Sequence, residues 1–390
     1  MAIPIVYNVR SVRVRWVSAV VAVIGIAGAV GVFVAMLSLA HGFQAALARA
    51  GSPDNAIVRR AGSNSEMESA VLLDEVRVIS DAPGVARSAD GRALVSAEVF
   101  VVTAMPRMDT GTDSNIPVRG VSPNAAQIRD GVKIVEGRFF EPGKAELIVG
   151  RAVSRTTRGL VLGDRPLFGG RQWTVVGISD ADGAAYESEI WCDATLLNES
   201  FDRPAGVFQS VTAKLTSPQA FDEFKAALTS DPRLNVQVQR ETDYYASRSE
   251  IMSTIIRSLG FLVAIVMGIG SVFAALNTMY SAVASRAREV ATLRALGFGP
   301  ISVVTSFVFE SLFIAVLGGI VGCLGSLPVN GMAVSTMNWQ TFSQLAFAFR
   351  ITPTILGLGM IFAIAMGFVG GLFPAIRAAR LPVASALREL

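Results

Sequence analysis

Few side chains in this sequence have the type and spacing that catalysis requires. The one histidine, His41, directly follows a long apolar run, a position typical of a polar residue at the level of lipid headgroups rather than of a metal ligand or general base. The chain has no HExxH, GxSxG or GxxxxGKS/T pattern, and Gly143-Lys144 is followed by Ala145. We therefore expect no catalytic residue, no metal site and no ATP-hydrolysing site on this chain.

The sequence also offers little for redox or hydrolytic chemistry. Cys192 lies in a water-soluble block and Cys323 in an apolar run, so neither a disulfide framework nor a cysteine metal site is expected. Carboxylates are scattered through residues 41–252, and no pair stands out. A membrane-anchored enzyme with an outer catalytic domain is therefore the least supported class of function.

One basic segment, Ser285 to Phe298, suits binding rather than catalysis. As a helix it would place Arg288, Ala291 and Ala295 on one side, and Gly297 would end it. Its apolar residues form a short stripe and are Val290, Leu293 and Leu296. Two interpretations follow from the residues alone: a connector that lies at the membrane surface, or a helix that a cytoplasmic partner protein binds.

Four apolar stretches must position this segment. A bilayer core of about 30 Å needs about 20 apolar residues in a helix, and the stretches that meet this are residues 17–40, 253–281, 300–328 and 351–376. A cleaved signal peptide is the rival interpretation of the first stretch. Its 24 residues exceed the apolar region of a signal peptide, so we expect four transmembrane helices.

Composition agrees with a membrane protein. The 390 residues are 52% hydrophobic and only 17% charged, whereas soluble domains carry about a quarter charged residues. Residues 1–40 and 253–390 together have a net charge of +8, and residues 41–252 have −5. Because the basic excess flanks apolar runs, it indicates membrane anchoring and argues against nucleic-acid binding.

The arginines predict which side of the membrane each segment faces. Short cytoplasmic segments accumulate Lys and Arg. Nine arginines lie in three such segments, and they are Arg10, Arg13, Arg15, Arg286, Arg288, Arg294, Arg377, Arg380 and Arg388. The short segment 329–350 contains only Arg350. We therefore expect residues 1–16, 282–299 and 377–390 to be cytoplasmic, and residues 41–252 and 329–350 to be outside.

The outer insert, residues 41–252, reads as an α+β domain of two lobes. Its predicted strands are rich in β-branched residues and bounded by turn residues, and they are 95–102, 132–140, 146–149, 172–178 and 207–215. Its predicted helices are 74–80 and 218–228. The predicted fold class is thus a polytopic α-helical membrane protein with a large α+β domain between its first and second transmembrane helices.

Two motifs carry a resemblance to a known family. The basic segment resembles the FtsX-like/MacB-type permease signature R-x-R-E-I/V-A/G-x-L-R-A-L/I-G of ABC transporters. The matching residues are Arg286, Arg288, Glu289, Val290, Ala291, Leu293, Arg294, Ala295, Leu296 and Gly297. The C-terminal run from Gly370 to Ala375, followed by Ala378-Ala379, Pro382 and the segment Ala386 to Glu389, is similar to the family's ending. The order of one span, a large outer domain and three spans also matches.

The resemblance implies a role without catalysis on this chain. It implies a dimer of four-span subunits, or pairing with a related permease, docked on a separate ABC ATPase subunit that binds ATP and Mg. The residues implied to couple to that ATPase are Arg286, Arg288, Glu289, Leu293, Arg294 and Gly297. MacB itself carries its ATPase on the same chain, so this sequence departs from that pattern. Family members work by mechanotransmission, in which closure of the ATPase changes the outer domains.

Glu310 is the one acidic residue inside a predicted span. An ionised carboxylate there costs about 3 kcal/mol, so Glu310 should face protein or water. It is interpreted as a structural hydrogen-bonding group or as a polar hinge between helices. The pairs Gly318/Gly322 and Gly367/Gly371 permit close helix approach, either within the chain or at a dimer interface.

The expected function is a permease subunit in the bacterial inner membrane that drives efflux from the periplasmic side. A periplasmic adaptor and an outer-membrane channel are the implied partners, besides membrane lipid. Two alternatives remain open: a lipoprotein-release permease, or an FtsX-like regulator that activates an outer partner such as a cell-wall hydrolase. Outer domains of such regulators are usually smaller, so the 212-residue insert favours transport.

Overall fold

The computed structural model describes residues 16–338 and 343–380. Nearly all of the predicted 1–16 segment and most of the predicted 377–390 tail therefore lie outside the described residues. The chain divides into two compact units. We call residues 1–41, 253–332 and 349–390 the helical unit, and residues 42–252 and 333–348 the α/β unit.

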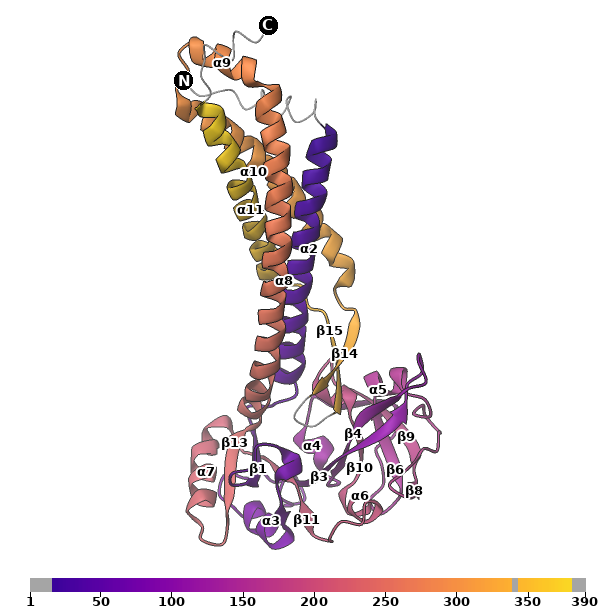
Figure 1. The fold of residues 1–390 in the computed structure, drawn as a ribbon. Coiled ribbons are helices and arrows are strands. Elements are labelled where there is room, and N and C mark those ends of the chain that lie inside the picture. Colours follow the sequence, from indigo (N-terminus) through magenta and orange to yellow (C-terminus); the bar gives the residue numbers. More distant parts are fainter. Residues whose placement is uncertain (1–15, 339–342, 381–390) are drawn as a thin grey trace. The chain divides into compact units, whose positions relative to one another are not determined.

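Four helices are long and apolar enough to cross a membrane (Figure 1). They are α2 (Trp16–Ala48), α8 (Glu241–Ser285), α10 (Pro300–Ser326) and α11 (Pro353–Ala379). Each covers one expected span to within two residues. Helix α2 continues beyond residue 40 to Ala48, and α8 begins well before residue 253 with a polar segment that hydropathy does not mark. Two short elements complete the helical unit, α9 (Ala287–Ala295) and η4 (Leu327–Val329).

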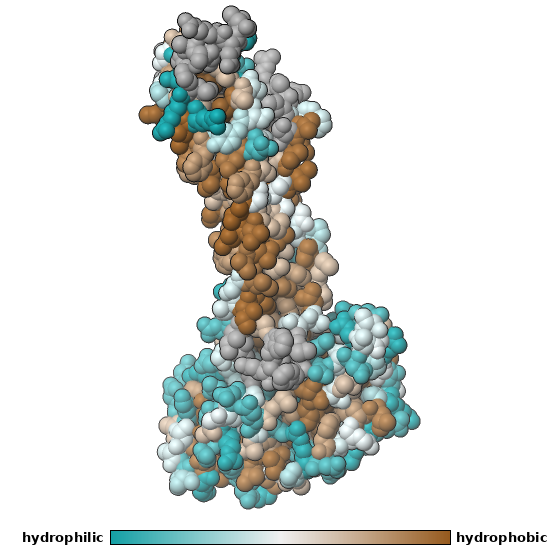
Figure 2. All heavy atoms as spheres, viewed as in Figure 1, coloured by the Kyte–Doolittle hydropathy of each residue, from teal (hydrophilic) through white to brown (hydrophobic). Residues whose placement is uncertain are grey.

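Glycines let the membrane helices approach closely. A Cβ added at Gly318 would lie 2.8 Å from Ile26 on α2, and one at Gly322 would lie 2.6 Å from the Ala27 carbonyl oxygen. Gly367 of α11 meets Ala315 of α10 in the same way. Both predicted glycine pairs thus contribute to packing within the chain. Apolar side chains on the outer surface of these helices give the brown area in Figure 2.

A nine-stranded mixed sheet forms the centre of the α/β unit, in the order β13-β1-β12-β3-β4-β10-β6-β9-β5. The strands are β1 (Asn55–Arg60), β3 (Val95–Pro106), β4 (Asp113–Val121), β5 (Lys133–Gly137), β6 (Glu146–Gly150), β9 (Thr174–Asp180), β10 (Ile190–Asp193), β12 (Ser210–Lys214) and β13 (Val236–Arg240). The pairs β4/β10 and β6/β9 are parallel, and the other pairs are antiparallel.

Smaller elements surround this sheet. Three two-stranded sheets pair β2 (Val71–Leu72) with β11 (Val207–Phe208), β7 (Leu167–Phe168) with β8 (Arg171–Gln172), and β14 (Ala333–Asn338) with β15 (Ser343–Ala348). The helices are η1 (Glu66–Glu68), α3 (Leu73–Ser80), α4 (Ala125–Ile128), α5 (Arg151–Thr156), η2 (Ala185–Ser188), α6 (Ala194–Ser200), η3 (Pro218–Ala220) and α7 (Phe221–Ser230).

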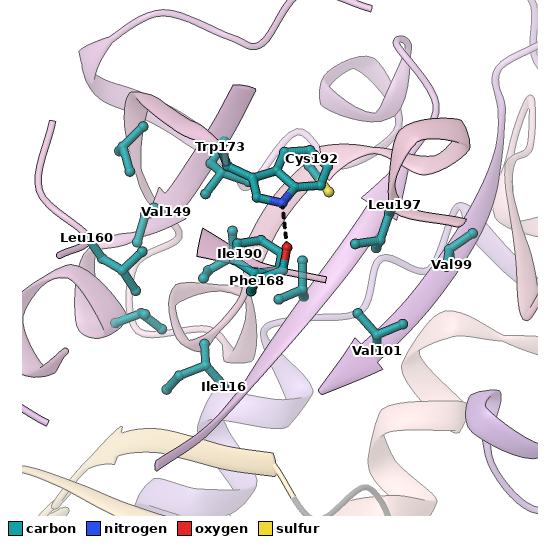
Figure 3. Close-up of a cluster of buried hydrophobic side chains, with 14 of the residues drawn as sticks. Val99, Val101, Ile116, Val149, Leu160, Phe168, Trp173, Ile190, Cys192 and Leu197 are labelled. Carbon is teal, nitrogen blue, oxygen red and sulfur yellow. Dashed lines mark hydrogen bonds between the residues drawn. The ribbon is translucent and has the colours of Figure 1, made fainter. Parts of the chain in front are cut away.

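Two hydrophobic cores lie along the sheet. One packs α3 and α7 on strands β1, β12 and β13, with Phe224 fully buried. The other surrounds Trp173, whose indole stacks on Phe168 at 5.3 Å and donates a hydrogen bond to the Phe168 carbonyl oxygen (Figure 3). Cys192 lies in this second core as a buried free thiol.

The expected outer loop 329–350 contains a β-hairpin that belongs to the α/β unit. Strands β14 and β15 pair in antiparallel register. The Phe347 ring lies 5.3 Å from the Phe43 ring, and the Ala346 amide donates to the Ser188 hydroxyl at 2.8 Å. The hairpin therefore packs on residues far from it in sequence.

Substitution by alanine at two glycines of α10 should change the stability of the helical unit in different ways. Gly322→Ala should destabilise the helical unit by about 1 to 3 kcal/mol, because the added methyl overlaps α2. Gly325→Ala, with nothing within 4 Å of its Cβ, should be neutral or stabilising by up to about 1 kcal/mol. Thermal unfolding in detergent would measure both effects. Unfolding is followed by the labelling of Cys323, which is buried in the folded protein, with a maleimide. Equal effects would contradict the predicted α2/α10 contact.

Candidate coupling site

Helix α9 is a short helix with a well-defined end. The amide of Phe298 donates to the Leu293 carbonyl oxygen, and the amide of Gly297 donates to that of Arg294. Gly297 has a φ of 93°, a left-handed conformation that glycine adopts readily. This is a Schellman motif, which satisfies the last carbonyl groups of a helix. Gly297 therefore fixes where α9 ends, as its sequence position suggested.

The two faces of α9 differ from those expected. Val290 and Ala291 are buried, and Val290 joins an apolar cluster with residues of α8, α10 and α11. Arg288, Thr292 and Leu296 are exposed, and Leu296 is 71% exposed. Ala291 therefore belongs to the buried face and Leu296 to the exposed face, because the helix docks by its Val290 side.

Arg286, at the N-cap of α9, is held inside the helical unit. Its Nη1 lies 2.8 Å from Oε2 of Glu310, and its Nε lies 3.3 Å from Oε2 of Glu289. The guanidinium also stacks 5.4 Å from the centre of the Phe307 ring. Arg286 is 8% exposed and Glu310 is 3% exposed. The pair therefore ties the start of α9 to α10.

The Arg286/Glu310 pair explains how α10 accommodates a buried carboxylate. A buried charge is tolerated when an opposite charge with good hydrogen-bond geometry faces it. Glu310 meets that condition through Arg286, and the bond joins two segments rather than two turns of one helix.

The other expected coupling residues lie around this anchor. The Glu289 side chain is 57% exposed beside Arg286, while Leu293 and Arg294 are half-buried. The α9 region thus brings Arg286, Glu289 and Glu310 into direct contact and leaves Arg288 on the opposite, exposed face. Whether these residues couple to an ATPase stays a prediction.

Sequence reasoning missed a second ionic site, in the α/β unit. Six buried charged residues share hydrogen bonds there: Glu66, Glu98, Arg119, Arg129, Glu189 and Glu241. The available signal was a charge inside an otherwise apolar strand, as for Glu98 within β3. No local spacing showed which charges would meet.

Among residues 16–338 and 343–380, no group of three His, Cys, Asp or Glu side chains is placed to hold a metal ion.

Four apolar helices, a basic helix between the second and third, and a large unit inserted after the first define a multi-pass membrane protein of the ABC permease class. Residues 19–231 match the family model of the MacB-like periplasmic core domain, and residues 261–383 match that of the FtsX-like permease C-terminal domain. The chain belongs to the FtsX-like, MacB-type ABC permeases.

Three curated relatives show the range of similarity. The macrolide export ATP-binding/permease protein MacB of Hyphomonas neptunium is 25% identical over 407 residues, which cover 97% of this chain and 60% of the relative. The pyoverdine export ATP-binding/permease protein PvdT of Pseudomonas entomophila is 27% identical over 65% of this chain and 40% of its own length. The ABC transporter permease YknZ of Bacillus subtilis is 29% identical over 35% of this chain and 32% of its own.

Solved structures of outer domains are similar to part of the chain. The extracellular domain of the noncanonic ABC-type transporter YknZ from Gram-positive bacteria aligns over 47% of this chain and 99% of that one, with 18% identity and a TM-score of 0.36. The periplasmic region of MacB from Actinobacillus actinomycetemcomitans aligns over 51% of this chain and 94% of that one, with 11% identity and a TM-score of 0.38.

The chain spans about 60% or less of the length of the three curated relatives.

The Arg286/Glu310 pair gives a stability prediction. Glu310→Leu leaves a buried guanidinium without its main partner and should destabilise the helical unit by about 3 to 5 kcal/mol. Adding Arg286→Met removes that charge and should recover most of the loss, since apolar side chains replace a buried ion pair well. Melting of both variants in detergent would measure this. A double variant no more stable than Glu310→Leu would contradict the pairing.

Proposed function

We propose that this chain is the permease subunit of an exporter and that α9 is the helix through which an ATP-binding subunit drives it. The observation that carries the proposal is the division of α9 into two faces. One face is buried at Val290 and Ala291, with Val290 in the apolar cluster, while Arg288 and Leu296 lie on the exposed face. A partner that contacts the exposed face would therefore displace α10 together with α9, because Arg286 ties them.

ATP and Mg²⁺ belong to the partner in this proposal. The 390 residues contain no nucleotide-binding loop, whereas the MacB and PvdT relatives are named ATP-binding/permease proteins. We assign hydrolysis to an ATP-binding subunit supplied outside these residues. This chain then has a mechanical rather than a catalytic role.

Export is the favoured use of that mechanism. Two relatives are named for macrolide and pyoverdine export, and the MacB-like periplasmic core domain model matches residues 19–231, which include most of the α/β unit. We propose a homodimer in the inner membrane with cytoplasmic termini, which works with a periplasmic adaptor and an outer-membrane channel. Lipoprotein release and activation of a cell-wall hydrolase remain the alternatives.

Copurification tests the assignment of partners. The full chain, extracted in mild detergent from its own host, should bring down an ATP-binding subunit and an adaptor. A captured hydrolase would favour the regulatory alternative, and captured lipoprotein would favour lipoprotein release. A complex without any ATP-binding subunit would refute the proposal.

Arg288→Glu and Leu296→Asp should uncouple the two subunits. Both change the exposed face of α9, so the permease should insert and melt as the wild type does while its stimulation of ATP hydrolysis falls about tenfold, equivalent to about 1.4 kcal/mol of lost contact. Arg92→Glu, a charge reversal at an exposed arginine of the α/β unit, is the control. Unchanged stimulation in both α9 variants would remove α9 from the coupling surface.

The orientation of the chain can be measured with single cysteines. Thr112→Cys in the α/β unit and Thr292→Cys in α9 occupy exposed positions, and the native Cys192 and Cys323 are buried. An impermeant maleimide should label Thr112→Cys in cells with a permeabilised outer membrane, and Thr292→Cys only after the inner membrane is opened. Labelling of both under the first condition would overturn the orientation.

A further inference from the structure

The ends of α2 and α8 in the α/β unit lead into neighbouring strands. Helix α2 is followed by β1, α8 is preceded by β13, and β1 and β13 pair in antiparallel register from Ala56/Arg240 to Arg60/Val236. Gly51 lies so close to α8 that a Cβ there would be 2.8 Å from the backbone of Thr242. The chain leaving one helix and the chain entering the other are thus joined at one edge of the sheet.

Glu241, the first residue of α8, is the centre of this region. Its side chain is fully buried. Oε2 accepts hydrogen bonds from the Ser52 amide at 3.0 Å and from Asn55 Nδ2 at 2.8 Å. Oε1 accepts from the Tyr186 hydroxyl at 2.8 Å and lies 3.4 Å from Arg129 Nε. We call these five residues the Glu241 junction.

The groups that hold α8 at the Glu241 junction keep the protonation states that their hydrogen bonds require. Burial raises the pKa of the Tyr186 hydroxyl well above its ordinary value, so Tyr186 remains a donor. Burial alone would lower the pKa of Arg129, but Glu98, Tyr186 and Glu241 together outweigh it and hold that pKa well above its usual range. Tyr245, one turn further along α8, adds a hydroxyl contact of 3.1 Å to Tyr186.

Arg129 extends the junction into the middle of the sheet. Its guanidinium donates to both carboxylate oxygens of Glu98 on β3 and, at 3.0 Å, to the Thr212 hydroxyl on β12. Glu98 also accepts from Arg119 on β4 at 2.9 Å. Arg119 in turn bonds two further carboxylates, those of Glu66 and Glu189. A continuous chain of charge-assisted bonds therefore runs from the first residue of α8 to the strands between the two lobes.

Of the six charged residues in this network, only Glu241 lies on a helix that continues into the helical unit. The others lie on strands, on η1 or on loops of the α/β unit. A cavity of about 240 Å³ adjoins the junction and is lined in part by Asn55, Arg129, Tyr186 and Glu241.

We propose that Glu241 is a positioning residue that passes displacement of α8 to strands β3 and β12 through Arg129. The inference rests on the proposed mechanical function of the permease. It adds the point at which motion enters the outer sheet, whereas α9 is the point at which motion enters the chain. Loss of the Glu241 carboxylate should therefore separate ATP-driven motion from its outer effect and leave the cytoplasmic coupling intact.

The test compares Glu241→Gln with Glu189→Gln in the full chain bound to its copurifying ATP-binding subunit. Each substitution removes one buried carboxylate charge from the same network, but Glu189 does not belong to α8. Hydrogen exchange of β3 and β12 is measured with and without a non-hydrolysable ATP analogue, alongside ATP hydrolysis and melting. We expect the nucleotide-dependent change in exchange to fall below half of the wild-type value in Glu241→Gln only, with hydrolysis retained in both variants.

A purely structural role would lower melting similarly in both variants without separating their exchange responses. If wild type shows the nucleotide-dependent change and Glu241→Gln keeps it, the role of Glu241 is refuted while the proposed function stands. If wild type shows no such change, mechanical transmission itself is refuted, and the role of Glu241 with it. Faster exchange of residues 241–247 in Glu241→Gln, but not in Glu189→Gln, would independently support the junction.

Discussion

Burial of charge is the constraint on which the organisation of this protein depends. An ion removed from water is stable only while its partners stay in place, so each buried pair fixes the segments that carry it. Arg286 and Glu310 fix the start of α9 to α10, and Arg129 and Glu241 fix the start of α8 to the sheet. In both places a helix begins at a residue whose side chain is locked by opposite charge.

Apolar packing stabilises the two units in different ways. In the helical unit, apolar residues cover the outside, and small residues such as Gly318 and Gly322 bring the helices together. In the α/β unit, large side chains such as Trp173 and Phe224 fill two cores on one sheet. Two members of the charged network, Glu98 on β3 and Arg119 on β4, lie on strands of this same sheet.

Hydropathy and motif reasoning were sufficient for the four spans, the family and the basic helix, because each is encoded in contiguous residues. They were insufficient where distant residues meet. Arg119 and Glu189 are 70 positions apart, and no local spacing marks their pairing. The polar start of α8 was missed because hydropathy marks only apolar residues. The faces of α9 depended on which side packs against α8, α10 and α11, so Leu296 was assigned to the wrong face.

The hairpin β14/β15 has a consequence for dissection of the molecule. Because residues 333–348 belong to the α/β unit, the polypeptide passes between the two units four times rather than twice. A fragment limited to residues 42–252 would lack the contacts that Phe347 and Ala346 of the hairpin make with Phe43 and Ser188. Such a fragment would therefore differ from the unit as it exists in the whole chain.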